Sequence, residues 1–228
     1  MDCPGCSAAL PLLREAGENL ARPVLVGIGG PGGSGKSSFA AKLAAHLGDA
    51  RIVPLDDYRK PRAERPKGRY GSHPAGNRID VLKSHLDDAR NARSFERPVF
   101  CRDRGAAIES ETIHPARFIL ADGEIAAHRE LRDCFDVRIL VLAGLPLQWR
   151  ARMGRDRRER ATSLRKAMTL FCISNLLDYP RFSAGMKSEA DLILRRTPCG
   201  RLLAQTGPLE TKATKACVCH PQAVGWRW

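Results

Sequence analysis

The stretch that decides the fold is GGPGGSGKSS, residues 29–38. It follows the apolar run VLVGI (24–28) and precedes FAAKLAAHLG (39–48), in which apolar residues recur at helical spacing before a glycine. A buried strand is therefore expected to lead into a glycine-rich loop and then into a helix. Residues 30–37 match the pattern G-x-x-x-x-G-K-[ST] without a mismatch.

This loop has the composition of a phosphate cradle. Glycines let backbone N–H groups converge on phosphate oxygens, and the dipole of the following helix favours the same negative charge. Lys36 would reach the β- and γ-phosphates, and the Ser37 hydroxyl would ligate Mg²⁺. A turn that merely caps a helix is the alternative, but the flanking strand and helix favour a site for ATP and Mg²⁺. The predicted nucleotide-binding residues are Gly30, Pro31, Gly32, Gly33, Ser34, Gly35, Lys36, Ser37 and Ser38.

The rest of the chain alternates strand and helix patterns. Further strands are expected at 51–55, 117–122, 137–144 and 191–196, a short edge strand at 97–102, and a helix at 79–93. Such alternation predicts an α/β fold, a P-loop three-layer sandwich with a five-stranded, mostly parallel sheet. We expect an N-terminal appendage (1–22), the P-loop domain (23–197) and a C-terminal tail (198–228).

The charge balance points to anionic partners. The 228 residues carry 38 Lys and Arg against 25 Asp and Glu, a net charge of +13. Nucleic acid, a membrane surface and phosphorylated small molecules all fit this balance. No apolar run approaches the roughly 20 residues that cross a bilayer, and the first residues lack the basic-then-apolar order of a signal peptide. We therefore expect a cytoplasmic protein with no membrane partner.

Three of the eight cysteines lie in the body of the chain and five near its ends, Cys199 among them. Three in the body of the chain are predicted to be small buried hydrophobes in a reducing compartment: Cys101, Cys134 and Cys172. Near the ends, a zinc site could form if the termini meet, although the CVCH spacing is tighter than that of usual zinc knuckles and favours free thiols on loose tails. The candidate zinc ligands are Cys3, Cys6, Cys217, Cys219 and His220.

Two carboxylates end the second expected strand, in the segment LDDYRK (55–60). Ligands bind at the carboxyl ends of parallel strands, so Asp56 and Asp57 are expected beside the phosphate loop. A carboxylate there can accept the proton of a hydroxyl that attacks the γ-phosphate. The alternative is an aspartate pair that caps a turn. No Asn in the chain is followed by Lys, so the guanine-binding N-K-x-D segment of GTPases is absent.

Taken in order, several segments resemble the uridine kinase and phosphoribulokinase family. They are GGPGGSGKSS, LDDY, GSHPAGNRIDVL, RPVF, FILADGEI, LRDCFDVRILV, RARMGRDRRER and the later YPRF. The resemblance covers roughly residues 24–195. It implies a parallel sheet, ATP with Mg²⁺, and phosphoryl transfer to a hydroxyl group of a small molecule.

The resemblance also implies site residues. Asp56 matches the catalytic aspartate, with Lys36 and Arg155 as further catalytic residues. Asp122, where the family usually has Glu before Gly, would hold the Mg²⁺ shell through water. RARMGRDRRER (150–160) resembles the arginine-bearing lid, whose matching residues are Arg152, Arg155 and Arg160. The alternatives for this basic run are a solvated helix face or a nucleic-acid patch.

Departures from the family concern the acceptor. Where the family has H-P-D the chain has His73-Pro74-Ala75, and where it has P-V-Y-D the chain has Phe100-Cys101 after Pro and Val. Carboxylate and phenol groups that would grip sugar hydroxyls are thus missing, and Thr162 replaces the last lid arginine. We expect either a uridine kinase-like enzyme or a kinase for an anionic sugar, polyol or other metabolite. The candidate acceptor-binding residues are Asp57, Tyr58, Arg69, His73 and Arg78.

A P-loop ATPase or nucleic-acid-binding protein is the alternative from another class. The basic runs contain few aromatic residues, which weakens a single-strand-binding interpretation. A small-molecule hydroxyl acceptor is therefore the expected partner. The sequence is also compatible with a homo-oligomer.

Overall fold

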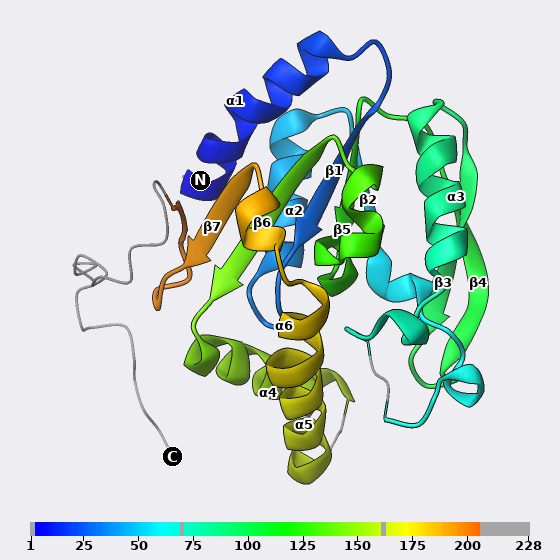
Figure 1. Cartoon of the computed structure of the whole chain (residues 1–228), viewed down its shortest axis with the longest axis vertical. Helices are drawn as coiled ribbons and strands as arrows, with labels where there is room; N and C mark the ends of the chain where they lie inside the picture. Colours follow the sequence, from blue (N-terminus) through cyan, green and yellow to red (C-terminus); the bar gives the residue numbers. More distant parts are fainter. Residues whose placement is uncertain (1–2, 69–70, 161–162, 206–228) are drawn as a thin grey trace.

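The computed structural model describes residues 3–68, 71–160 and 163–205, with the backbone alone for 155–160. Its centre is a six-stranded sheet in the order β2-β5-β1-β6-β7-β8 (Figure 1). The first five strands in that order are parallel, and β8 is antiparallel to β7. The α/β fold is confirmed, whereas the expected count of five omitted the short β8. The bounds are β1 Val24–Gly29, β2 Ala50–Pro54, β5 Phe118–Asp122, β6 Val137–Ala143, β7 Leu192–Arg196 and β8 Leu202–Ala204.

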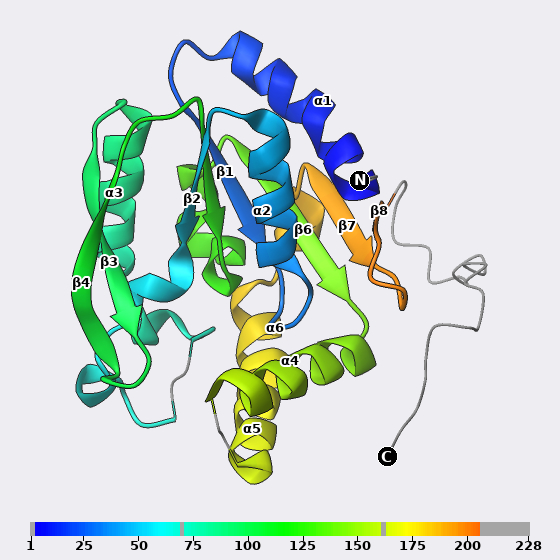
Figure 2. The same cartoon turned by 180° about the vertical axis from the view of Figure 1, so that it is seen from behind.

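Helices cover both faces of this sheet (Figures 1 and 2). Alternate residues of β1 point to opposite faces: Val26 packs in one core cluster with α1 and α2, and Leu25 packs in another with α3. The result is the expected three-layer sandwich. The helices are α1 Pro4–Asn19, α2 Lys36–Leu47, α3 Ile79–Arg90, α4 Leu145–Arg160, α5 Leu164–Phe171, a π-helical segment Cys172–Asp178, α6 Tyr179–Phe182 and α7 Met186–Glu189.

A separate antiparallel hairpin lies beside α3 (Figure 2). Its strands are β3 Phe95–Cys101 and β4 Ala106–Ile113, with a register shift between Val99 and Phe100. The short strand expected at 97–102 is present as part of β3, and it pairs with β4 rather than with the main sheet. Most residues of β4 are exposed, so this strand carries no apolar run that marks it in the sequence.

The N-terminal segment contributes to the core. Cys6, Ala9 and Leu13 of α1 are fully buried in one cluster with Phe39 of α2. A Cβ at Gly5 would lie 3.0 Å from Cβ of Leu202, so the first helix also touches β8 closely. The stretch expected to be an appendage thus contains a packed helix, although the boundaries 1–22, 23–197 and 198–228 stay a prediction.

The cysteines differ from expectation in part. Cys3 and Cys6 form a disulfide. Cys101 and Cys134 are half-buried, and Cys172 is exposed, so the prediction of burial is wrong for Cys172. The other proposed zinc ligands, at 217, 219 and 220, lie outside the described residues. Within the described part, no group of three or more His, Cys, Asp or Glu side chains could hold a metal ion.

No helix in the described segments is both long enough and apolar enough to span a bilayer.

Candidate active site

A cavity of about 460 Å³ opens where β1, β2 and β5 end. The parallel register brings Asp122 level with Ile28 of β1 and with Pro54 of β2, so the loops after all three strands meet. This edge of a parallel sheet is where ligands bind in such folds. The lining residues are Gly32, Gly33, Gly35, Lys36, Ser37, Ser38, Pro54, Asp56, Asp57, Arg102, Asp122, Gly123, Glu124, Ala151 and Arg196.

The phosphate loop has the backbone that its glycines allow. Gly33 and Gly35 have φ angles of 82° and 102°, in the left-handed region that other residues rarely adopt. A Cβ at Gly33 would lie 2.6 Å from the carbonyl oxygen of Gln148 in α4. The loop is therefore a tight cradle with no room for side chains at this position.

Positive groups converge on the same cradle. Lys36 is the first residue of α2, is buried, and donates from Nζ to the Pro31 carbonyl oxygen at 3.1 Å. The first turn of α2 leaves backbone N–H groups without helical partners, and its dipole places partial positive charge there. Ser37, which lines the cavity, has an exposed side chain suited to ligating Mg²⁺. These residues fit a nucleoside triphosphate with its magnesium ion.

The two aspartates after β2 have different surroundings. Both lie in the 3₁₀ turn Leu55–Tyr58. Asp56 is 44% exposed and forms an ion pair with Arg59 at 2.6 Å. Asp57 accepts from the Arg97 guanidinium and, at 3.1 Å, from the Phe100 N–H. Asp57 therefore ties the hairpin to the end of β2, whereas Asp56 is the more accessible carboxylate of the cavity.

Burial raises the pKa of Asp57 above its ordinary value, although Phe100 and Arg97 act in the opposite direction. Its carboxylate is engaged by donors from β3 on two sides. A proton acceptor must be able to reach the substrate hydroxyl. Of the two aspartates, Asp56 is better placed for that role.

Three of the expected acceptor-binding residues do not line the cavity. Tyr58 is fully buried in the core, where its hydroxyl hydrogen-bonds to Nδ1 of His85 at 2.9 Å. His73 caps a short turn: its Nδ1 accepts from the Ala75 N–H, and its ring packs edge-on against Phe182. Arg78 precedes α3 and donates its backbone N–H to the Tyr58 carbonyl. Arg69 lies outside the described residues.

Two arginines that the sequence interpretation did not select line the cavity instead. Arg102 directly follows β3, in the turn of the β3–β4 hairpin. Arg196 ends β7 and donates from Nη1 to the Gly33 carbonyl oxygen at 3.3 Å. Neither belongs to a recognised motif, and only the fold brings them to the site.

Glu124 is the other site residue that was missed. It lies in a 3₁₀ turn directly after β5, two residues beyond Asp122. Its carboxylate accepts from the Ser72 hydroxyl and, at 3.2 Å, from the Ser174 hydroxyl, and it lies 4.0 Å from Nη1 of Arg152. The segment ADGEI did contain this carboxylate, but only Asp122 matched the family pattern.

Glu124 and Arg152 meet at the phosphate loop. A Cβ at Gly32 would lie 2.7 Å from Oε1 of Glu124 and 2.8 Å from Nη1 of Arg152. Arg152 also donates to Asn175, whose amide donates to the Gly32 carbonyl oxygen at 2.8 Å. Of the expected lid residues, Arg152 is therefore beside the loop; the side chains of Arg155 and Arg160 lie outside the described part.

The comparisons with known proteins agree with this geometry. The model of the "Phosphoribulokinase / Uridine kinase family" matches residues 25–202. Uridine kinase of Clostridium tetani is 28% identical over 182 residues, covering 76% of this chain and 87% of the relative. Uridine kinase of Halobacterium salinarum is 27% identical over 177 residues, covering 74% and 78%.

A solved structure shares the fold at low identity. D-glycerate 3-kinase of Cryptococcus neoformans superposes with a TM-score of 0.69 at 13% identity, covering 87% of this chain and 96% of that chain. The family match runs from β1, the strand before the phosphate loop, to the first residue of β8, and it confirms the resemblance noted from the sequence. The chain belongs to the phosphoribulokinase and uridine kinase family of P-loop kinases.

Proposed function

We propose that this protein transfers the γ-phosphoryl group of ATP to a hydroxyl group of a small, anionic metabolite. The main observation behind this proposal is that the phosphate loop, Lys36, Asp56 and Asp122 all line one cavity. Family membership supports a kinase that uses ATP and a small-molecule acceptor. The identity of the acceptor rests on residues particular to this chain.

Each residue has a physical role in this proposal. The loop N–H groups and Lys36 hold the phosphates and offset the charge that moves toward the leaving oxygen. Ser37 and, through water, Asp122 would hold Mg²⁺, which would supply further charge neutralisation at the phosphates. Asp56 accepts the proton of the acceptor hydroxyl as its oxygen attacks. Arg152, whose guanidinium lies beside Gly32, neutralises negative charge on the γ-phosphoryl group as it is transferred.

We infer the acceptor class from two charged residues that line the cavity. Arg102 and Asp56 both line it, so an acceptor with a hydroxyl for Asp56 and a negative group for Arg102 satisfies both. Phe100 and Cys101 offer no phenol or carboxylate for ribose hydroxyls, and Phe100 is covered by Arg65, whose guanidinium carbon is 5.0 Å from the ring centre. A carboxylated or phosphorylated polyol fits better than uridine or cytidine.

The test is ADP release measured with a panel of acceptors. The panel contains uridine, cytidine, D-glycerate and phosphorylated or carboxylated sugars. We expect a higher kcat/KM for one of the anionic polyols, and Arg102→Ala should lower that value while leaving ATP hydrolysis without acceptor unchanged. Efficient phosphorylation of uridine at micromolar KM would contradict the anionic acceptor and indicate an ordinary uridine kinase. Turnover stimulated by nucleic acid alone would favour a P-loop ATPase that binds nucleic acid.

Two variants test the catalytic roles. Lys36→Ala should abolish turnover, because no other group of α2 replaces its charge at the phosphates; Lys42→Ala, at an exposed position of the same helix, is the matched control. Asp56→Asn preserves the shape but cannot accept a proton, which costs about 10²–10⁴ in rate. Near-normal turnover in Lys36→Ala would overturn the proposal.

A further inference from the structure

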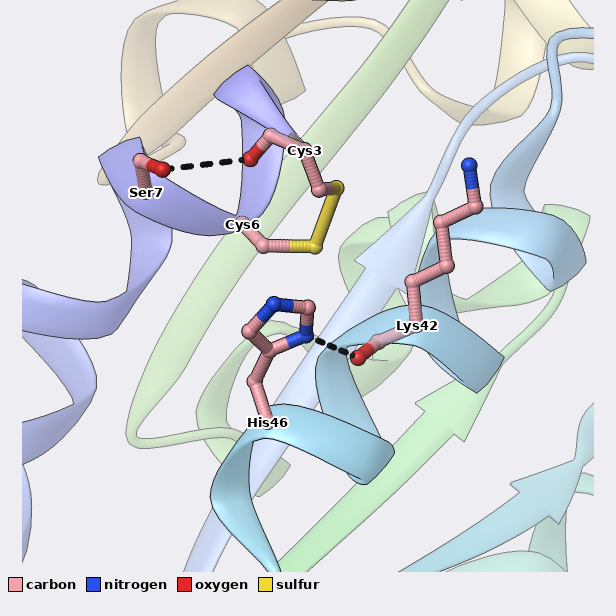
Figure 3. The surroundings of a disulfide bond; sticks show 5 residues. All are labelled: Cys3, Cys6, Ser7, Lys42 and His46. Atoms are coloured by element: carbon pink, nitrogen blue, oxygen red, sulfur yellow. Dashed lines mark hydrogen bonds between the residues drawn. A yellow bond between two sulfur atoms is a disulfide. The ribbon is translucent and has the colours of Figure 1, made fainter. Parts of the chain in front are cut away.

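The Cys-Pro-Gly-Cys segment at the start of α1 has no part in the proposed kinase site. Cys3 is the residue before the helix, Pro4 is its first residue, and Cys6 completes the first turn. The two cysteines form a disulfide, with their Cα atoms 5.2 Å apart (Figure 3). No residue of α1 lines the cavity, and the pair lies in the layer formed by α1 and α2.

The two sulfur-bearing residues differ in access. Cys6 is 1% exposed and packs in the cluster that contains Phe39 and Leu43 of α2. Cys3 is only half-buried. A thiol from solution can therefore reach the Cys3 side of the bond, whereas Cys6 is shielded by the core. This asymmetry between an accessible and a shielded cysteine is what a directional exchange reaction requires.

The helix closes the same turn without the disulfide. The Ser7 N–H donates to the Cys3 carbonyl oxygen at 2.9 Å, and the Ser7 hydroxyl donates to the same oxygen at 3.3 Å (Figure 3). A cross-link between residues three apart removes little entropy from the unfolded chain compared with a long loop. The backbone of this turn can therefore persist in both the dithiol and the disulfide state.

The surroundings favour a thiolate on reduction. Free N–H groups of the first turn and the helix dipole stabilise negative charge at this end. The first turn of α1 contains no acidic residue. His46 of α2 is drawn next to the disulfide, and its Nδ1 hydrogen-bonds to the Lys42 carbonyl oxygen at 2.7 Å, which holds the ring on the helix, whereas the Lys42 amino group points away from the sulfurs (Figure 3).

We propose that Cys3 and Cys6 form a reversible redox pair that exchanges with thiols of the glutathione class. A thiolate of the reductant attacks Sγ of Cys3, the bond between the cysteines breaks, and Cys6 leaves as the thiolate and takes up a proton. A second thiolate then attacks the external sulfur of this mixed disulfide and releases Cys3. Two external thiols become one external disulfide, so two electrons pass to the protein.

The first experiment uses the full chain in buffers of varied reduced and oxidised glutathione. Samples are acid-quenched and alkylated, and the peptides are quantified by mass spectrometry. Cys3 and Cys6 should change together and reversibly, and Cys134→Ser, which removes a half-buried cysteine elsewhere, should leave their titration unchanged. A pair that stays in one state across the whole range would overturn the proposal.

The second experiment tests direction. With oxidised glutathione, Cys6→Ser should trap a mixed disulfide at Cys3, whereas Cys3→Ser should be modified at Cys6 at least tenfold more slowly. Circular dichroism shows whether each variant is folded; if one is not, the alkylation rates of the two thiols in the reduced wild-type protein provide the same comparison. Equal rates at the two cysteines would refute the assigned roles. Since the readout is covalent modification, the result is independent of the proposed kinase function.

Discussion

Replacing Gly33 by alanine tests whether the phosphate loop and α4 are packed as tightly as the contacts indicate. Gly33 has φ 82°, and its new Cβ would lie 2.6 Å from O, 3.1 Å from Cα and 3.2 Å from C of Gln148. Real Cβ atoms essentially never approach closer than 3.0 Å, so the start of α4 must retreat from the loop. Since these are backbone atoms, no side-chain rotation relieves the contact.

Gly48 offers a matched control. Its φ is 76°, but a Cβ there would meet nothing within 4 Å. Alanine at positive φ is strained at both positions, by roughly 1–2 kcal/mol in the left-handed helical region; Gly48, with ψ −68°, lies outside that region, so its cost is at least as large. For a domain of this size about 1 kcal/mol corresponds to roughly 2–4 °C, so Gly48→Ala should lower Tm by at least about 2 °C without affecting ATP use.

Gly33→Ala should show the same strain and a second effect at the site. Displacing α4 moves Arg152 away from Gly32 and changes the backbone conformation of the phosphate loop. We expect KM for ATP to rise at least about tenfold, which corresponds to roughly 1.4 kcal/mol. The assays are thermal denaturation and ADP release at varied ATP. If Gly33→Ala matched Gly48→Ala in both Tm and KM, the packing of α4 on the loop would not be what requires glycine.

Three further predictions concern individual side chains. Glu124→Gln removes the charge that faces Arg152 but keeps an oxygen that accepts from Ser72. We therefore expect kcat to fall about tenfold with little rise in KM for ATP, and a rise in KM alone would contradict this. Asp57→Asn should lower the free energy of unfolding in urea by only about 0.5–1.5 kcal/mol, because the lost bond to Arg97 is offset in part by the burial cost of the carboxylate charge that the raised pKa reflects. It should reduce kcat far less than Asp56→Asn; the opposite ranking would exchange their roles. Burial lowers the pKa of His128 from 6.5 to about 4, so between these pH values the imidazole is neutral in the native state and protonated in the unfolded chain. The free energy of unfolding should therefore fall by about 3 kcal/mol as the pH drops from 6.5 to about 4. In urea titrations at each pH, His128→Phe should flatten that dependence.

The parts of the fold that the sequence predicted are those with a strong local pattern. Buried parallel strands such as 24–29 are continuous apolar runs, and the phosphate loop is specified by its glycines and lysine. Both signals are contained in a few neighbouring residues. The strands of the main sheet other than β8 were accordingly located to within one or two residues.

The parts of the fold and of the site that the sequence did not predict depend on contacts between distant segments. The strand β4 is mostly exposed and is recognisable only by its pairing with β3. Tyr58 follows two aspartates in a polar segment, yet the 3₁₀ turn directs it into the core beside His85. Arg102 and Arg196 reach the cavity because of where β3 and β7 end. None of these placements is encoded in the neighbouring residues alone.

The contact between the first helix and the last strand has a consequence for synthesis. Gly5 packs against Leu202, and Leu13 shares its cluster with Leu194, so the docking surface of α1 is completed by residues translated almost at the end of the described chain. At about 5–20 residues per second, the apolar face of α1 is exposed for roughly 10–40 seconds before that surface exists. During most of its elongation, the nascent chain can therefore pack α1 only against the early elements β1 and α2, and the part of the helix that meets β7 and β8 stays exposed until the end.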